Sequence, residues 1–229
     1  SFAFAQWPDY PSPNVPRTAD GKPNLGAPAP RTADGKPDFS GVWGRAGGQN
    51  ALTGTSATPA LPPDGIPIAT FSNAGQGFKD DLPFQPAAAD LMKKRRADNS
   101  KDNPDAHCLP MGFLQFHNHP EPRKIIQTPQ LLAIIYEANH GLRQIFMDGR
   151  KLPDKDKVEP WYYGYSVGHW EGETLVVETT GFNDGQWLDV RGSPLTDAAK
   201  VTERFRRPNL GSLEIVITVD DPKAYTKPW

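Results

Sequence analysis

The sequence predicts a mainly β protein, either an antiparallel up-and-down barrel or a strongly curved meander, with one short helix and a Pro-rich extended N-terminal arm. Short segments rich in β-branched and aromatic residues follow one another from residue 124 to residue 219, and turn residues separate most of them. One segment, residues 86–96, has the composition of a helix. We expect an arm at residues 1–37 and one β domain at residues 38–229.

The arm is defined by prolines that recur from residue 8 to residue 37. Proline removes backbone donors and excludes both a helix and a central strand, so the arm must be extended or polyproline-like. Within it, residues 17–23 (RTADGKP) recur unchanged as residues 31–37. The Asp-Gly and Lys-Pro pairs of each copy predict a tight chain reversal. Because the arm has too little apolar surface to fold alone, we expect it to lie on the domain or on another protein.

The core is expected to begin at residues 38–43, which contain large apolar side chains. Residues 47–77 are rich in Gly, Ala, Ser, Thr and Pro, which is typical of a long loop with at most a short strand at residues 66–71. The helix at residues 86–96 starts with proline and ends with four cations, which suit its dipole.

Hairpins are then expected to follow hairpins. The predicted strands are residues 124–128, 131–138, 142–148, 163–170, 174–182, 200–206 and 213–219. Turn chemistry occupies the connections at residues 139–141, 148–150, 171–173 and 208–211.

Charge argues against a nucleic-acid partner. The chain has 25 Lys and Arg against 27 Asp and Glu, a formal net charge of -2, and its longest basic run is residues 93–96. Binding to phosphates needs a concentrated basic face. No apolar run approaches the roughly 18 residues that a membrane helix requires. We expect no nucleic acid and no membrane span, which leaves an assembly at a membrane surface open.

The first residues resemble the end of an export signal, with Ala3 and Ala5 at the small positions before Gln6. They favour a periplasmic or secreted location, and an ordinary N-terminus is the alternative. The single cysteine, Cys108, has no partner for an intramolecular disulfide within this sequence, which is compatible with any compartment.

Four segments resemble a widespread but uncharacterised family of exported bacterial proteins: residues 38–43, 168–184, 201–205 and 220–229. The resemblance implies export and carries no activity. It also implies that the chain continues past Trp229 into a tail with a cysteine, which leaves a disulfide partner for Cys108 open. In addition, Gly41-Val42-Trp43 is similar to the Gly-x-Trp opening of lipocalin-type barrels, so the expected fold is lipocalin-like.

A metal site is one hypothesis for the loop after the helix. Imidazole and thiolate are ligands that zinc and copper prefer, and the loop holds four such groups: His107, Cys108, His117 and His119. The two histidines that are two residues apart point to one side if their segment is extended. The alternative is that the cysteine packs as a small hydrophobe and the histidines hydrogen-bond within the loop.

A second hypothesis is catalysis by a polar set on the strands. His169 with a carboxylate such as Glu178 or Asp148 is the predicted general base, because imidazole titrates near neutral pH and a carboxylate orients it. No serine, cysteine or lysine nucleophile accompanies it. The alternative is that these side chains form cross-strand pairs on the solvent face, each worth roughly 0.2 to 1 kcal/mol.

A third hypothesis is a pocket for an apolar or planar ligand. Its candidate residues are aromatic side chains and one cation from several strands: Trp43, Tyr136, Arg143, Tyr165 and Trp170. The alternative is that they belong to the ordinary core.

The expected function is non-catalytic: an exported binding or accessory protein for a small apolar ligand, or for a protein partner that the arm contacts. The alternative is a hydrolase, hydratase or isomerase that uses His169, or the pair His117 and His119, with or without a metal. No phosphate loop, nucleotide fingerprint or heme-attachment pair occurs, so no organic cofactor is expected.

Overall fold

The computed structural model describes residues 15–45, 74–75, 78–119 and 121–229. The export-signal segment at residues 1–6 and the short strand expected at residues 66–71 lie outside the described residues. The same holds for most of the long loop expected at residues 47–77.

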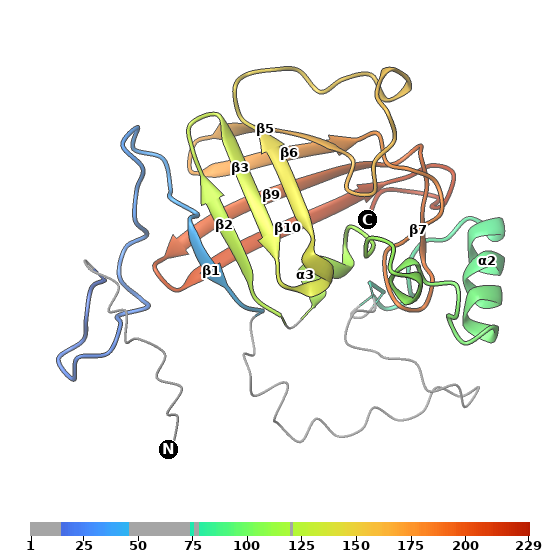
Figure 1. Cartoon of the computed structure of the whole chain (residues 1–229), viewed down its shortest axis with the longest axis horizontal. Helices are drawn as coiled ribbons and strands as arrows, with labels where there is room; N and C mark the ends of the chain where they lie inside the picture. The colour runs from blue at the N-terminus through green and yellow to red at the C-terminus, as the bar shows by residue number, and fades with distance from the viewer. Residues whose placement is uncertain (1–14, 46–73, 76–77, 120) are drawn as a thin grey trace, which may run out of the picture.

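An eight-stranded sheet dominates the described structure (Figure 1). Its strands, in spatial order, are β1 (Gly41–Trp43), β2 (Arg123–Gln127), β3 (Leu131–Tyr136), β4 (Leu142–Phe146), β5 (Tyr165–Glu171), β6 (Thr174–Thr180), β9 (Lys200–Asn209) and β10 (Ser212–Asp220). A separate two-stranded sheet joins β7 (Gln186–Trp187) to β8 (Pro194–Leu195). The helices are α2 (Pro86–Ala97) and α3 (Gln115–Asn118), with short 3-10 turns at Pro104–His107, Ala138–His140 and Lys155–Lys157.

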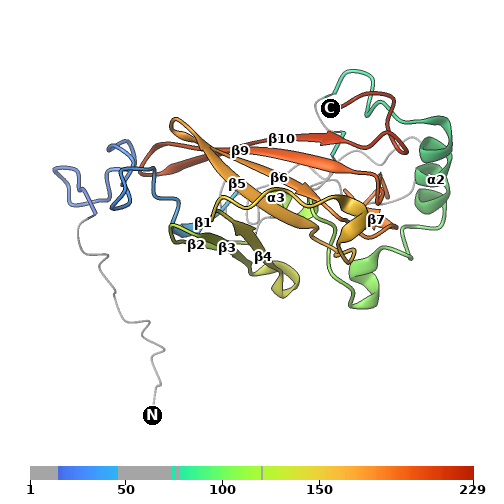
Figure 2. The same ribbon diagram turned by 90° about the horizontal axis from the view of Figure 1, so that it is seen from above.

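The sheet curls on itself. Seen from above, strands β1 to β4 turn under the long strands β9 and β10 (Figure 2). The edge strands β1 and β10 are not paired with each other, so the sheet is an open half-barrel with a seam between these two edges. The predicted fold class, a mainly β, lipocalin-like curved fold with one short helix, is confirmed, and α2 is the longest helix that the structure describes.

One strand pairing differs from a simple succession of hairpins. β4 and β5 are parallel, with Ile145 opposite Ser166 and Phe146 opposite Val167. The turn at residues 148–150 therefore does not join antiparallel neighbours. Residues 147–164 instead cross over to the start of β5, because parallel neighbours need a long connection.

The concave face of the sheet carries the main core. Side chains on β9 alternate strictly, with Val201, Glu203, Phe205 and Arg207 buried and the intervening ones more exposed. The buried apolar cluster consists of Phe39, Met111, Phe116, Ile125, Leu132, Ile134, Tyr136, Ala138, Ile145, Leu175, Val177 and Phe205. Two charged side chains of β9 thus share the interior with this cluster.

A second core lies at the end of the sheet next to α2. The helix buries only Ala88 and Met92, and its Arg95 stacks 4.6 Å from the centre of the Trp187 ring. Arg95 also donates a hydrogen bond of 2.9 Å to the carbonyl of Gly192. The predicted helix is confirmed, and its cations serve packing as well as the helix end. No helix of the described residues is long and apolar enough to cross a membrane.

Candidate functional site

A buried ion pair occupies the concave face of the half-barrel. Arg143 of β4 and Glu203 of β9 are 3% and 0% exposed, and the guanidinium binds the carboxylate with both of its terminal nitrogens, Nη1 at 2.9 Å from Oε1. The Nη2 group also donates to the hydroxyls of Ser166 at 3.1 Å and Thr179 at 3.0 Å. The two terminal nitrogens are thus bonded, whereas the buried Nε has no hydrogen-bond partner among the described residues.

His117 of α3 extends this pair. Its ring is buried, and Nε2 lies 3.1 Å from Oε1 of Glu203. The other ring nitrogen, Nδ1, lies 3.2 Å from Nη1 of Arg123 and accepts its hydrogen bond, which places the imidazole proton on Nε2. Burial lowers the pKa of His117 and outweighs the opposing effect of Glu203, so the imidazole is neutral near pH 7.

Glu203 stays ionised. Burial by itself would raise its pKa, but Arg143 and His117 together lower the pKa to about 2. The cluster of Arg143, Glu203 and His117 therefore carries no net charge at neutral pH.

Arg123 adds a positive charge that this cluster does not balance. It begins β2 and is only 6% exposed. Its guanidinium donates to Nδ1 and to the carbonyl oxygen of His117, both at 3.2 Å, and lies 5.8 Å from the centre of the Tyr136 ring. Among the described residues, no carboxylate lies within ion-pair distance of Arg123. Burial lowers the pKa of Arg123 from its ordinary value, and an arginine side chain nevertheless remains charged in a protein.

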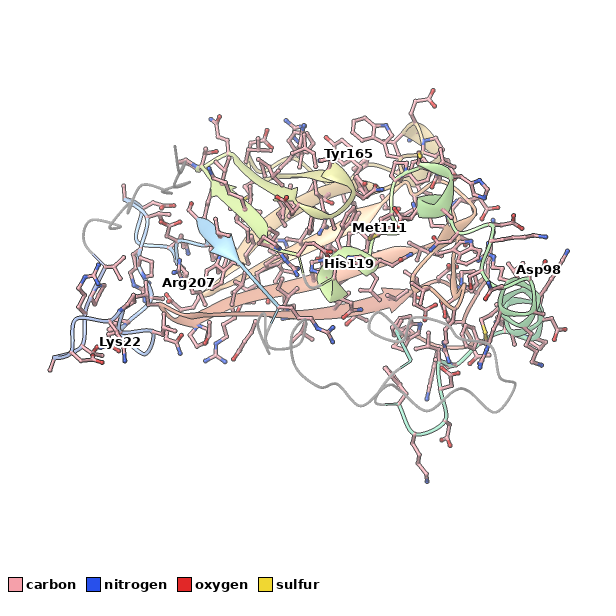
Figure 3. The ribbon with its side chains drawn as sticks, turned by 60° about the horizontal axis from the view of Figure 1, so that its bottom comes forward. Lys22, Asp98, Met111, His119, Tyr165 and Arg207 are labelled. Atoms are coloured by element: carbon pink, nitrogen blue, oxygen red, sulfur yellow. The ribbon has the colours of Figure 1, made fainter. Side chains whose placement is uncertain are left out.

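A pocket of about 250 Å³ opens beside Arg123, at the seam of the half-barrel. One wall is apolar and comes from β10. The other comes from the end of β1, and α3 supplies the floor together with Arg123. The lining residues are Trp43, Gly44, Arg45, His117, Asn118, Arg123, Leu213, Ile215 and Ile217. We call this cavity the seam pocket. Figure 3 views the side on which α3, marked by His119, lies near β1 and the long strands.

Three of the five predicted ligand-binding residues lie in or near this site. Trp43 lines the seam pocket, Arg143 forms the buried ion pair, and Tyr136 stacks on Phe116 with the ring centres 4.3 Å apart. The other two lie elsewhere and are described next.

Tyr165 is on the outer face of β5, where its ring stacks on Phe146 and its hydroxyl accepts a hydrogen bond from Arg150. Trp170 stacks on Phe39 and lines a different pocket of about 330 Å³. The seam pocket and the Trp170 pocket therefore divide the predicted set.

The predicted catalytic residues do not come together. Each forms its own surface pair: His169 lies 3.5 Å from Glu171, Glu178 lies 2.5 Å from Lys200, and Asp148 lies 2.6 Å from Arg150. Trp170 packs inward, so strand alternation places the preceding residue, His169, on the outer face.

The predicted metal ligands do not come together either. His107 and Cys108 are exposed, and Nε2 of His107 lies 2.8 Å from the carbonyl of Lys101. His119 is turned toward Glu121, with Nδ1 2.7 Å from Oε2. Among the described residues, no group of three or more His, Cys, Asp or Glu is placed to hold a metal ion. Only His117 belongs to the seam site.

Arg123 is the residue that the sequence interpretation missed. It shares the inward parity of Ile125 on β2, as Glu203 shares that of Val201 and Phe205 on β9. The signal available in the sequence was a charged residue two positions from buried apolar residues of the same strand, and therefore on the same face.

No family model, curated protein or solved structure matches this chain. The fold and the pocket define its structural class: the protein is an open, mainly antiparallel half-barrel whose seam contains a cationic, partly apolar pocket.

Proposed function

We propose that the protein is a non-catalytic binding protein for a small ligand with an apolar body and an anionic group, and that the seam pocket is its site. The observation that carries the proposal is Arg123, a buried cation at the pocket with no carboxylate partner among the described residues. Removing a charge from water costs several kcal/mol unless a counter-charge is present. An anionic ligand supplies that counter-charge.

The remaining lining suits the apolar part of such a ligand. Trp43 offers a planar face, and Leu213, Ile215 and Ile217 form a continuous aliphatic wall on β10. A dry apolar cavity of roughly 150 Å³ holds benzene, so a pocket of about 250 Å³ has room for an aromatic ring system with one carboxylate.

Binding is better supported than catalysis at this site. A general base needs a free ring nitrogen or carboxylate oxygen aimed at the substrate. Both ring nitrogens of His117 lie against Arg123 and Glu203, and the carboxylate of Glu203 is held by Arg143. A hydrolase, hydratase or isomerase therefore stays the alternative hypothesis.

The test is calorimetric titration with 2-naphthoate and its uncharged analogue 2-naphthylmethanol. The variant is Arg123→Gln, and the matched control is Arg206→Gln on the exposed face of β9. Hydrogen bonds to charged groups contribute about 1.5 to 3 kcal/mol, so Arg123→Gln should weaken naphthoate binding by roughly 10-fold or more. The control should bind as the wild type does.

The neutral analogue separates charge from shape. It should bind the wild type more weakly than naphthoate does, and Arg123→Gln should not weaken it further. Two results would contradict the proposal. One is that the wild type binds naphthoate and the neutral analogue with equal affinity, and the other is that Arg123→Gln binds naphthoate as tightly as the wild type does.

We also propose a periplasmic or secreted location, which the sequence supports through its signal-like first residues and its resemblance to an exported family. Such a location suits a protein that binds a small solute or accompanies a larger assembly.

A further inference from the structure

The two copies of the seven-residue repeat fold alike. In residues 17–23 and in residues 31–37, the first and last residues form an isolated antiparallel bridge. The arginine of each copy donates to the glycine carbonyl four residues later, at 2.6 Å for Arg17 and 2.8 Å for Arg31. The threonine of each copy bonds the lysine carbonyl through both its amide and its hydroxyl. The repeat is thus a small preformed knob.

The second knob is docked on the tip of the hairpin between β5 and β6. Arg31 binds Glu173 with two nitrogens, Nη1 to Oε1 at 3.0 Å and Nη2 to Oε2 at 2.7 Å. The ammonium of Lys36 lies 5.6 Å from the centre of the Trp170 ring and 3.5 Å from the carbonyl of Gly172. The hairpin tip that receives the second knob, which we call its receptor, therefore offers a carboxylate, a free carbonyl and an aromatic face.

The first knob has the same side chains and no such receptor. All of residues 17–23 are exposed, whereas Pro37 of the second knob is buried. Lys22 meets only Asp20 of its own knob, at 3.1 Å, among the described residues. The Nη2 group of Arg17, whose counterpart in Arg31 binds Glu173, has no acceptor among them either.

The segment between the knobs holds the first one away from the domain. Two backbone amides at the tip of the hairpin between β9 and β10 bind this segment. The amide of Leu210 donates to the carbonyl of Ala27 at 2.8 Å, and the amide of Gly211 donates to the carbonyl of Leu25 at 2.9 Å. Figure 3 shows Lys22 at the margin of the molecule, beyond this hairpin. The first knob is therefore presented to solvent.

We propose that the first knob is a docking element for a β-hairpin of a different protein, whose tip carries a glutamate, an unpaired carbonyl and a neighbouring aromatic residue. Identical side chains in an identical fold recognise that chemistry within this chain, which defines what the exposed copy can bind. A second copy of the chain is a poorer occupant, because its own residues 31–37 already cover its Glu173 and Trp170.

The test uses the full ¹⁵N-labelled chain and a disulfide-closed hairpin peptide with the sequence of residues 165–180. At millimolar peptide, the backbone amide signals of residues 17–22 should shift. The shifts should be lost in Arg17→Gln, kept in the control Arg206→Gln, and lost with a peptide that carries Glu173→Gln. Because Arg17 is exposed, the rest of the spectrum of Arg17→Gln should stay unchanged.

Three outcomes would overturn the proposal. One is the absence of shifts at residues 17–23, and another is shifts confined to residues 31–37. The third comes from sedimentation without peptide: self-association that Arg17→Gln abolishes would make the occupant a second copy of this chain.

Discussion

At the scale of single residues, the charged groups around His117 separate into a balanced set and an unbalanced one. Arg143 and Glu203 neutralise each other, and the neutral ring of His117 lies against the carboxylate of Glu203. Among the described residues, Arg123 bonds only neutral partners, and it faces the seam pocket. This separation assigns stability to the first set and ligand recognition to the second.

Replacing Glu203 should destabilise the fold strongly. Glu203→Gln leaves Arg143 buried with its charge uncompensated, and breaking a buried pair typically costs about 3 to 5 kcal/mol. The control is Glu214→Gln on the exposed side of β10, which should change the free energy of unfolding by less than about 0.5 kcal/mol. Urea unfolding measures both, and a similar small change in the two variants would contradict the assigned role.

Acid should destabilise the protein in two steps. The lowered pKa of His117 means that below about pH 6.5 the unfolded chain takes up a proton that the folded chain resists. Glu203 has a folded pKa of about 2 against an ordinary 4.5, so its contribution is full above pH 4.5 and is lost as the pH falls toward 2.

The matching variants assign each step. His117→Gln should remove the decline in unfolding free energy between pH 7 and pH 5, and Glu203→Gln should remove part of the decline below pH 4.5. The measurement is urea unfolding across this pH range. A free energy that stays flat between pH 7 and pH 5 in the wild type would count against the His117 assignment, and one that stays flat from pH 4.5 to pH 2 would count against the Glu203 assignment.

At the scale of elements, one close contact fixes the segment that leads into α3. A side-chain carbon at Gly112 would lie 1.6 Å from the carbonyl oxygen of Trp187. Gly112→Ala should therefore displace this segment and cost about 1 to 3 kcal/mol of unfolding free energy. Gly26→Ala is the control, since its added carbon meets its nearest neighbour at an ordinary 3.6 Å. Thermal unfolding that is unchanged in both variants would refute this explanation.

The elements themselves could be predicted well, because local residue patterns largely determine where strands and turns form. The helix at residues 86–96 and the seven predicted strands all have counterparts in the structure. The parallel pairing of β4 with β5 could not be predicted, because the turn residues at 148–150 indicate a local reversal and say nothing of which distant strand lies alongside.

At the scale of the whole molecule, stability should decrease from the middle of the sheet to its seam. β6 lies between β5 and β9 and buries Leu175, Val176 and Val177, whereas β1 is a three-residue edge strand. Hydrogen exchange should be slowest in β6 and much faster in β1. Equal protection of the two strands from exchange would contradict the description of β1 as an open edge of the sheet.

The candidate site was harder to predict than the fold. The seam pocket joins β1, α3, β2 and β10, which are far apart in the sequence, and only Trp43 and His117 of its lining residues were candidates from the sequence. Motif reasoning selected His169, His107 and Cys108, which lie on the surface. It also selected the pair His117 and His119, of which His117 lines the seam pocket. The alternation of buried residues within strands would also have selected Arg123, since it reports which side chains face inward.

The most direct test of the central claim is the NMR signal of the guanidinium Nε–Hε group of Arg123, identified by its absence in Arg123→Gln. On titration with 2-naphthoate this signal should shift and its exchange with water should slow, because an anion then bonds the buried guanidinium. The neutral 2-naphthylmethanol should leave it nearly in place. A signal that responds to neither compound, while naphthoate still binds, would place the ligand elsewhere and contradict the assignment of the seam pocket.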